Sequence, residues 1–128
     1  MNAARPLPAR SLEGMRILLA EDSWHLATAL RQTLEQAGAI VVGLAPTVAQ
    51  AEHLSRTIGF DAAVMDLNLR DEMTTPLVTR LAQDGHKVIV ITGYAPDAQL
   101  LPRVHACLTK PTTGEALISA LLRPLGEP

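Results

Sequence analysis

Five polar residues that directly follow apolar runs carry the groups needed for phosphoryl chemistry. They are the carboxylates Glu21, Asp22 and Asp66, the hydroxyl of Thr92 and the ammonium of Lys110. A carboxylate can attack phosphorus and form an acyl phosphate. Positive groups and hydroxyl or N–H donors then stabilise the charge on the phosphoryl oxygens. These residue types predict transfer of a phosphoryl group to a carboxylate.

Three carboxylates held close together would need a positive group between them. Like charges at short range raise one another's pKa and oppose folding. One compensation is a hard divalent cation, for which oxygen ligands favour Mg²⁺ (or Mn²⁺). The other is Lys110. Gly93, next to Thr92, leaves room for the backbone to approach a bound group closely.

Five apolar runs predict the β-strands that position these groups. The runs span 16–20, 39–43, 61–66, 87–91 and 104–108. They are continuously apolar rather than alternating, which is typical of a parallel sheet covered on both faces by helices. The covering helices are predicted at 23–37, 47–59, 75–85 and 112–122. The stretch 95–103 is short and contains two prolines, so it leaves room for only a turn or two of helix.

The polar groups begin where the predicted strands end. Ligands of open α/β sheets bind at the carboxyl ends of the strands. If the first and third strands are neighbours, Glu21, Asp22 and Asp66 converge at this edge of the sheet. The same edge would receive Thr92 from the fourth strand and Lys110 from the fifth.

The order of these motifs resembles the receiver domain of two-component response regulators. An acidic pair, a single Asp, Thr92-Gly93 and Lys110-Pro111 follow successive strands in the family's order, over residues 16–122. The resemblance implies an α/β fold with a doubly wound, five-stranded parallel sheet of strand order 2-1-3-4-5. It also implies a cis peptide bond between Lys110 and Pro111.

The resemblance assigns a role to each matching residue. Asp66 would be the phosphoacceptor, and Lys110 would bind the phosphoryl group. Glu21 and Asp22 would hold Mg²⁺ together with Asp66 and the main-chain carbonyl of Asn68. The phosphodonor would be a histidine kinase or a histidine phosphotransfer protein.

The predicted switch departs from the common family pattern. Thr92 would be the switch hydroxyl, but Cys107 stands where receivers usually carry an aromatic residue. Tyr94 is the ring close enough to replace it. The Thr-Gly-Tyr sequence and the short following segment are similar to a subgroup of stand-alone receivers named for an F-A-T-G-U-Y signature, in which the fourth helix is poorly formed.

The last predicted helix carries two apolar stripes. Leu117, Ala120 and Leu121 can face the core, whereas Ile118 and Leu122 form a second stripe that continues to residue 125. A helix that is apolar on two sides is either deeply buried or presents an interface. We expect a surface for a partner or for a homodimer here.

Composition excludes several other classes of function. The net charge of −2, the absence of a basic run and the three aromatic residues argue against nucleic-acid binding. No apolar run is long enough to span a membrane. The single cysteine and the lack of a signal peptide predict a cytoplasmic protein. The expected organisation is a disordered lead-in at 1–13, the receiver domain at 14–124 and a tail at 125–128.

The leading hypothesis is a stand-alone receiver that signals through contact with an unknown downstream protein. Apart from its own phosphorylation and dephosphorylation, it would catalyse no reaction. One alternative is a pseudo-receiver that binds its partner without phosphorylation. The intact set of the acidic pair, Asp66, Thr92 and Lys110 argues against it, whereas Cys107 leaves it open. An aspartate-nucleophile phosphatase is disfavoured because Asp66-Leu67-Asn68 lacks the second acid of its usual D-x-D motif. A flavodoxin-like cofactor binder is disfavoured because no hydroxyl-rich phosphate loop follows the first strand.

Overall fold

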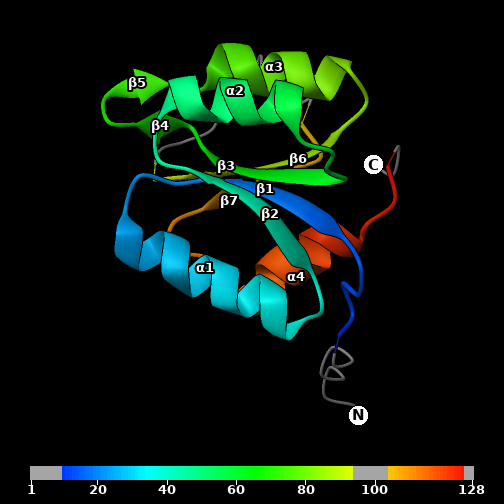
Figure 1. Ribbon diagram of the computed structural model, residues 1–128. Helices are drawn as coiled ribbons and strands as arrows, with labels where there is room; N and C mark the ends of the chain where they lie inside the picture. Colours follow the sequence, from blue (N-terminus) through cyan, green and yellow to red (C-terminus); the bar gives the residue numbers. More distant parts are fainter. Residues whose placement is uncertain (1–9, 94–103, 126–128) are drawn as a thin grey trace.

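In the part of the protein that the structure describes, a five-stranded parallel sheet lies between two layers of helices (Figure 1). The computed structural model describes residues 10–93 and 104–125. Helices α2 (Val48–Thr57) and α3 (Thr75–Gln83) cover one face of the sheet. Helices α1 (Trp24–Gln36) and α4 (Gly114–Leu122) cover the other. None of the helices in the described ranges is long and apolar enough to cross a membrane.

The sheet has the strand order expected from the resemblance. Its strands are β1 (Arg16–Ala20), β2 (Ile40–Ala45), β3 (Ala62–Asp66), β6 (Lys87–Thr92) and β7 (Ala106–Thr109). All neighbours are parallel, and the spatial order is β2-β1-β3-β6-β7. Counting only these five strands along the chain gives 2-1-3-4-5. The prediction of a doubly wound parallel sheet is therefore confirmed.

Polar side chains cap three of the four helices in the described residues, as predicted. Ser23, Thr47 and Thr113 each accept a hydrogen bond from a backbone N–H in the first turn of the helix that follows. Such caps satisfy donors that have no partner inside the helix. The cap of α3 differs, because Thr74 makes no side-chain bond to its own helix.

Two apolar layers hold the helices to the sheet. The layer under α2 and α3 includes Leu18, Ala63 and Val90, and the layer under α1 and α4 includes Ile17, Val64 and Ile91. Strand β3 is buried throughout and contributes alternate side chains to both layers. Burying a Val or Leu side chain contributes about 1.5–3 kcal/mol. The central strand that ends in the predicted phosphoacceptor is thus fixed from both sides.

A short β-hairpin follows β3 and was not predicted from the sequence. Its strands are β4 (Asn68–Leu69) and β5 (Glu72–Met73), which pair antiparallel. The two residues between them, Arg70 and Asp71, have φ values of 51° and 66°. A two-residue turn of this kind normally selects Gly or Asn because φ is positive. The sequence therefore lacked the usual turn signal.

Four expectations from the sequence differ from the structure or lie outside the described residues. Packing begins before the predicted boundary at residue 14, since Leu12 is buried and its N–H donates to the carbonyl of Ala37 at 2.7 Å. Strand β2 extends to Ala45 rather than residue 43. The predicted short helix at 95–103 and the predicted switch residue Tyr94 lie outside the described residues.

The second apolar stripe of the last helix is only partly exposed. Ile118 packs against the core, whereas Leu122 is 40% exposed and Leu125, beyond the helix, is 58% exposed. Exposure of these two leucines fits the predicted interface but identifies no partner.

Candidate functional site

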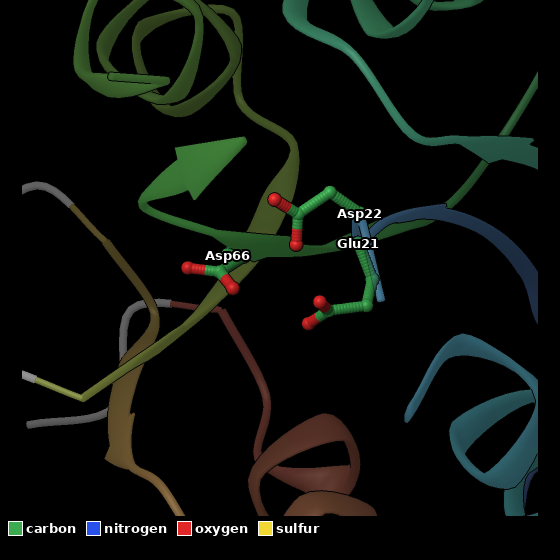
Figure 2. Close-up of side chains that lie close together, drawn as sticks. All are labelled: Glu21, Asp22 and Asp66. Carbon is green, nitrogen blue, oxygen red and sulfur yellow. The ribbon is translucent and has the colours of Figure 1, made fainter. Parts of the chain in front are cut away.

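Three carboxylates meet at the carboxyl ends of β1 and β3. One oxygen from each of Glu21, Asp22 and Asp66 lies within 4.8 Å of the others. Figure 2 shows the three side chains around one space, two from the end of β1 and one from the end of β3. Glu21 and Asp66 are buried, and Asp22 is half-buried. The convergence predicted from the sequence is therefore present.

The strand register explains why these carboxylates meet. Strands β1 and β3 are direct neighbours, and Ala20 pairs with Met65. Glu21 follows Ala20 along the chain, and Asp66 follows Met65. Because the two strands are parallel, the two acids lie at the same level of the sheet. Side chains of adjacent parallel strands at the same level lie roughly 5 Å apart. A shift of one residue in this register would separate them.

Lys110 supplies positive charge to the cluster. Its Nζ donates a hydrogen bond to Oδ2 of Asp66 at 2.6 Å and forms an ion pair with Oε1 of Glu21 at 3.4 Å. The N–H of Lys110 donates to the carbonyl of Thr92 at 2.8 Å, which continues the pairing of β6 with β7. The peptide bond from Lys110 to Pro111 is cis, as the resemblance implied.

The pKa values of Glu21, Asp22 and Lys110 are shifted from their ordinary values. Burial raises the pKa of Glu21, although the N–H of Ser23 and the charge of Lys110 partly oppose this. The pKa of Asp22 is lowered because its carboxylate accepts the N–H of Arg70. Burial works against the charged form of Lys110, but the hydrogen bond to Asp66 and the nearby acids raise its pKa. The cluster is therefore an electrostatically coupled unit.

The arrangement fits a hard divalent cation. Oxygen Oε1 of Glu21 is buried and, among the described residues, has no hydrogen-bond partner beyond its ion pair. Asp22 and Asp66 present further carboxylate oxygens to the same space. Mg²⁺ prefers such a set of a few carboxylates with room for water or a phosphoryl oxygen. A buried carboxylate oxygen that accepts no hydrogen bond is costly unless another group uses it, so the residues present fit the ion.

The remaining predicted residues are distributed around this centre. Thr92 is buried at the carboxyl end of β6, beside Lys110. The N–H of Asn68 donates to Oδ1 of Asp66 at 3.0 Å. Cys107 is half-buried on β7, where burial raises the pKa of its thiol. Cys107 lies opposite Val90, two positions before the Thr92–Thr109 pair, so it faces the α2–α3 layer and not the acids.

Two contacts near the acids were missed by sequence reasoning. Thr74 is fully buried, and its hydroxyl donates to the carbonyl oxygen of Asp66 at 2.7 Å. The N–H of Arg70, at the hairpin tip, donates to Oδ2 of Asp22 at 2.8 Å. A threonine two residues before Pro76 reads as an ordinary helix-start signal, and a backbone N–H carries no side-chain signal. The sequence pattern could not have identified either contact.

Comparisons with known proteins agree with this geometry. The family model of the response regulator receiver domain matches residues 17–122. The structure is similar to SdrG from Sphingomonas melonis Fr1, with 33% identity, coverage of 84% of this chain and 93% of that one, and a TM-score of 0.73. It is also similar to a CheY-like receiver domain protein from Methanospirillum hungatei JF-1, with 26% identity, coverage of 85% and 91%, and a TM-score of 0.76. No curated protein matches the chain. Together with the strand order and the acidic cluster beside Lys110, the match over most of the sequence shows that this chain belongs to the response regulator receiver domain family.

Proposed function

We propose that the protein accepts a phosphoryl group on Asp66 from a histidine kinase or a histidine phosphotransfer protein. The observation that carries this proposal is the coupling of Asp66 to Lys110 at 2.6 Å within a cluster of three carboxylates. Asp66 ends the most deeply buried strand of the sheet, yet its carboxylate faces the acidic cluster rather than the core. A carboxylate so fixed is preorganised for attack on phosphorus.

The chemistry follows from the groups that surround Asp66. An oxygen of Asp66 forms a bond to phosphorus while the bond from phosphorus to the donor's imidazole nitrogen breaks, and the imidazole keeps the electron pair. Negative charge stays on the phosphoryl oxygens. Lys110, which already contacts Asp66, is within reach of those oxygens. The hydroxyl of Thr92 and the backbone at Gly93 are proposed to hold the same group from the end of β6.

We propose that Mg²⁺, with Mn²⁺ as a substitute, occupies the acidic cluster. Glu21, Asp22 and Asp66 would hold it, together with the main-chain carbonyl of Asn68. When bound, such an ion neutralises charge that develops on the phosphoryl group. Oε1 of Glu21 supports the assignment, because it is buried and accepts no hydrogen bond from the described residues, and its ion pair with Lys110 is 3.4 Å long.

The signal is proposed to leave the domain through contacts with a downstream protein in the cytoplasm. Thr92 would link the phosphoryl group to β6 and β7. Leu122 is exposed on α4 beside the half-buried Ile118, and this surface would receive the partner or a second copy. Cys107 leaves no aromatic side chain on β7 to rotate, and Tyr94 is proposed to take that role. This Thr-Gly-Tyr arrangement supports assignment to the F-A-T-G-U-Y-like subgroup.

A second candidate function is a binding module that works without phosphorylation. The observation in its favour is Cys107, which is packed against the core on β7 instead of the usual aromatic switch. The phosphatase alternative finds less support, because the residue two positions after Asp66 is Asn68 and its side-chain oxygen accepts the N–H of Asp71 at 3.0 Å. That oxygen is thereby engaged in the hairpin.

The test is the intact mass of the protein after incubation with phosphoramidate and Mg²⁺. We expect one phosphoryl adduct on the wild type and none on Asp66→Asn. Asp61→Asn is the matched control, because it makes the same substitution at the opposite end of β3 and should keep the adduct. Chelation of Mg²⁺ should abolish labelling of both competent proteins. An unlabelled wild type, or a labelled Asp66→Asn, would count against the proposal and favour the phosphorylation-independent module.

A further inference from the structure

Thr74 makes an unusual choice of hydrogen-bond partner. It occupies the N-cap position of α3, where a threonine hydroxyl normally accepts a bond from its own helix. Ser23, Thr47 and Thr113 all do so at the other helices. Thr74 instead donates its hydroxyl to the main-chain oxygen of Asp66 at 2.7 Å, and its side chain is fully buried. The hydroxyl therefore serves the phosphoacceptor strand rather than the helix.

A second hydrogen bond makes this contact a clamp. The N–H of Thr74 donates to the carbonyl of Leu67 at 2.8 Å. The donors of Thr74 thus hold two successive carbonyls of the chain, those of Asp66 and Leu67. These two hydrogen bonds, here called the clamp, join the residues that precede and follow the hairpin segment 68–73. The contact fixes where the chain turns away from Asp66.

The hairpin that the clamp closes also contacts the acidic cluster. At its base, the N–H of Asn68 donates to Oδ1 of Asp66 at 3.0 Å. At its tip, the N–H of Arg70 donates to Oδ2 of Asp22 at 2.8 Å. Both carboxylates are therefore oriented by backbone N–H groups of one short element. The position of that element depends on the clamp that closes its base.

We propose that Thr74 is a positioning residue for phosphoryl transfer, which acts by fixing the main chain from Asp66 to Asn68. The proposal rests on Asp66 being the phosphoacceptor. With the clamp intact, the Asp66 carboxylate keeps the orientation that its hydrogen bond from the N–H of Asn68 gives it within the acidic cluster. Misplacement of a reacting group by about 1 Å can slow a reaction on the order of a hundredfold. Residues that support a site in this way are needed even though they touch no substrate.

The test compares one substitution that removes the Thr74 hydroxyl with one that keeps it. Thr74→Val keeps the shape of the side chain and removes the donor, whereas Thr74→Ser keeps the donor and removes a methyl group. Ile17→Val is the stability control, because it trims a fully buried side chain near the amino end of β1, away from the acids. Two readouts are taken on the full chain: Mg²⁺ affinity by titration calorimetry, and the rate of labelling by phosphoramidate at saturating Mg²⁺.

We expect Thr74→Val to label about ten- to a hundredfold more slowly and to bind Mg²⁺ several-fold more weakly. Thr74→Ser should stay close to the wild type in both readouts, as should Ile17→Val. Wild-type rates and affinities for Thr74→Val, or an equal loss in Ile17→Val, would overturn the proposal. A wild type that takes no phosphoryl group would argue against the proposed function, and the Mg²⁺ affinities would still decide whether Thr74 positions the site.

Discussion

The two ends of the parallel sheet carry charged residues that are organised in opposite ways. At the amino ends of the strands, Arg16 forms an ion pair with Asp61, and both side chains are about half exposed. Lys87 donates to the carbonyl of Leu121 at 2.7 Å, at the last turn of α4. At the carboxyl ends, Glu21 is 2% exposed and shares one space with two other acids.

The charges at the amino ends of the strands are compensated, whereas like charges are concentrated at the carboxyl ends. At the amino end, each of these charges has a partner of opposite sign or a helix carbonyl, an arrangement that stabilises a fold modestly. At the carboxyl end, like charges are brought together and one buried oxygen is left without a hydrogen bond from the described residues. Such an arrangement opposes folding in the absence of a bound cation. It is expected where a site must bind one.

The largest effect should come from comparing the two lysines. Lys110→Ala removes the cation in contact with Asp66, so we expect phosphoramidate labelling to slow by about a hundred- to a thousandfold. Lys87→Ala removes a lysine at the opposite end of the sheet and should label at the wild-type rate. Labelling kinetics by intact mass provide the measurement. Equal labelling rates for the two variants would contradict the proposal that only the carboxyl ends of the strands take part in phosphoryl transfer.

Mg²⁺ should stabilise the protein by binding to the acidic cluster at the carboxyl ends of the strands. At a Mg²⁺ concentration of one hundred times its dissociation constant, the free energy of unfolding should rise by about 2.7 kcal/mol. Glu21→Gln should gain much less, because the amide offers a poorer ligand. Glu35→Gln, which changes an exposed acid on α1, should respond like the wild type. Urea unfolding with and without Mg²⁺ would measure the difference.

The same variant predicts a pH dependence at the carboxyl end. Because burial raises the pKa of Glu21 above its ordinary 4.5, the folded state binds this proton more tightly than the unfolded state. Its contribution to stability is therefore lost as the pH rises through the folded pKa. In metal-free buffer, Glu21→Gln should remove this part of the pH profile. If Glu21→Gln left the pH dependence of stability unchanged, Glu21 would not be the source of that dependence.

The amino end should show the opposite dependence on pH, with a smaller effect. Burial lowers the pKa of His105 below 6.5, and the charges of Lys87 and Arg123 add to this. The folded state therefore binds the proton less tightly than the unfolded state. Its stabilising contribution is present above pH 6.5 and is lost as the pH falls through the folded pKa. Urea midpoints should show a shallower loss on acidification for His105→Gln than for the wild type, whereas His53→Gln, on an exposed position of α2, should retain the wild-type slope.

The smallest effect should come from the exposed ion pair. Asp61→Asn weakens the contacts of Asp61 with the guanidinium and the N–H of Arg16. Because both side chains are about half exposed, we expect a loss of about 0.2–1 kcal/mol. The loss should shrink further in high salt. A loss several times larger in urea unfolding would contradict the view that this ion pair stabilises the fold only modestly.

Features that depend on residues close together in the sequence were predicted, whereas some features that depend on residues far apart in the sequence were not. Strand β1 matches the predicted run at 16–20, and helix α1 begins after Ser23 as expected, because apolar runs and caps are local signals. The hairpin at 68–73 escaped prediction, since Arg70 and Asp71 adopt positive φ without glycine. Its conformation is supported by a contact with Asp22, 48 residues earlier in the chain.

The sequence by itself determined which polar groups lie at the carboxyl ends of the strands. Glu21, Asp22, Asp66 and Lys110 each follow an apolar run, and burial of those runs leaves the polar residues at one edge of a parallel sheet. Only the tertiary structure decided three features: the register of β1 against β3, the burial of Oε1 of Glu21 without a hydrogen bond from the described residues, and the hydrogen bond from the Thr74 hydroxyl to Asp66. These depend on distances between segments that are far apart in the chain, and such distances are set by packing rather than by local residue preference.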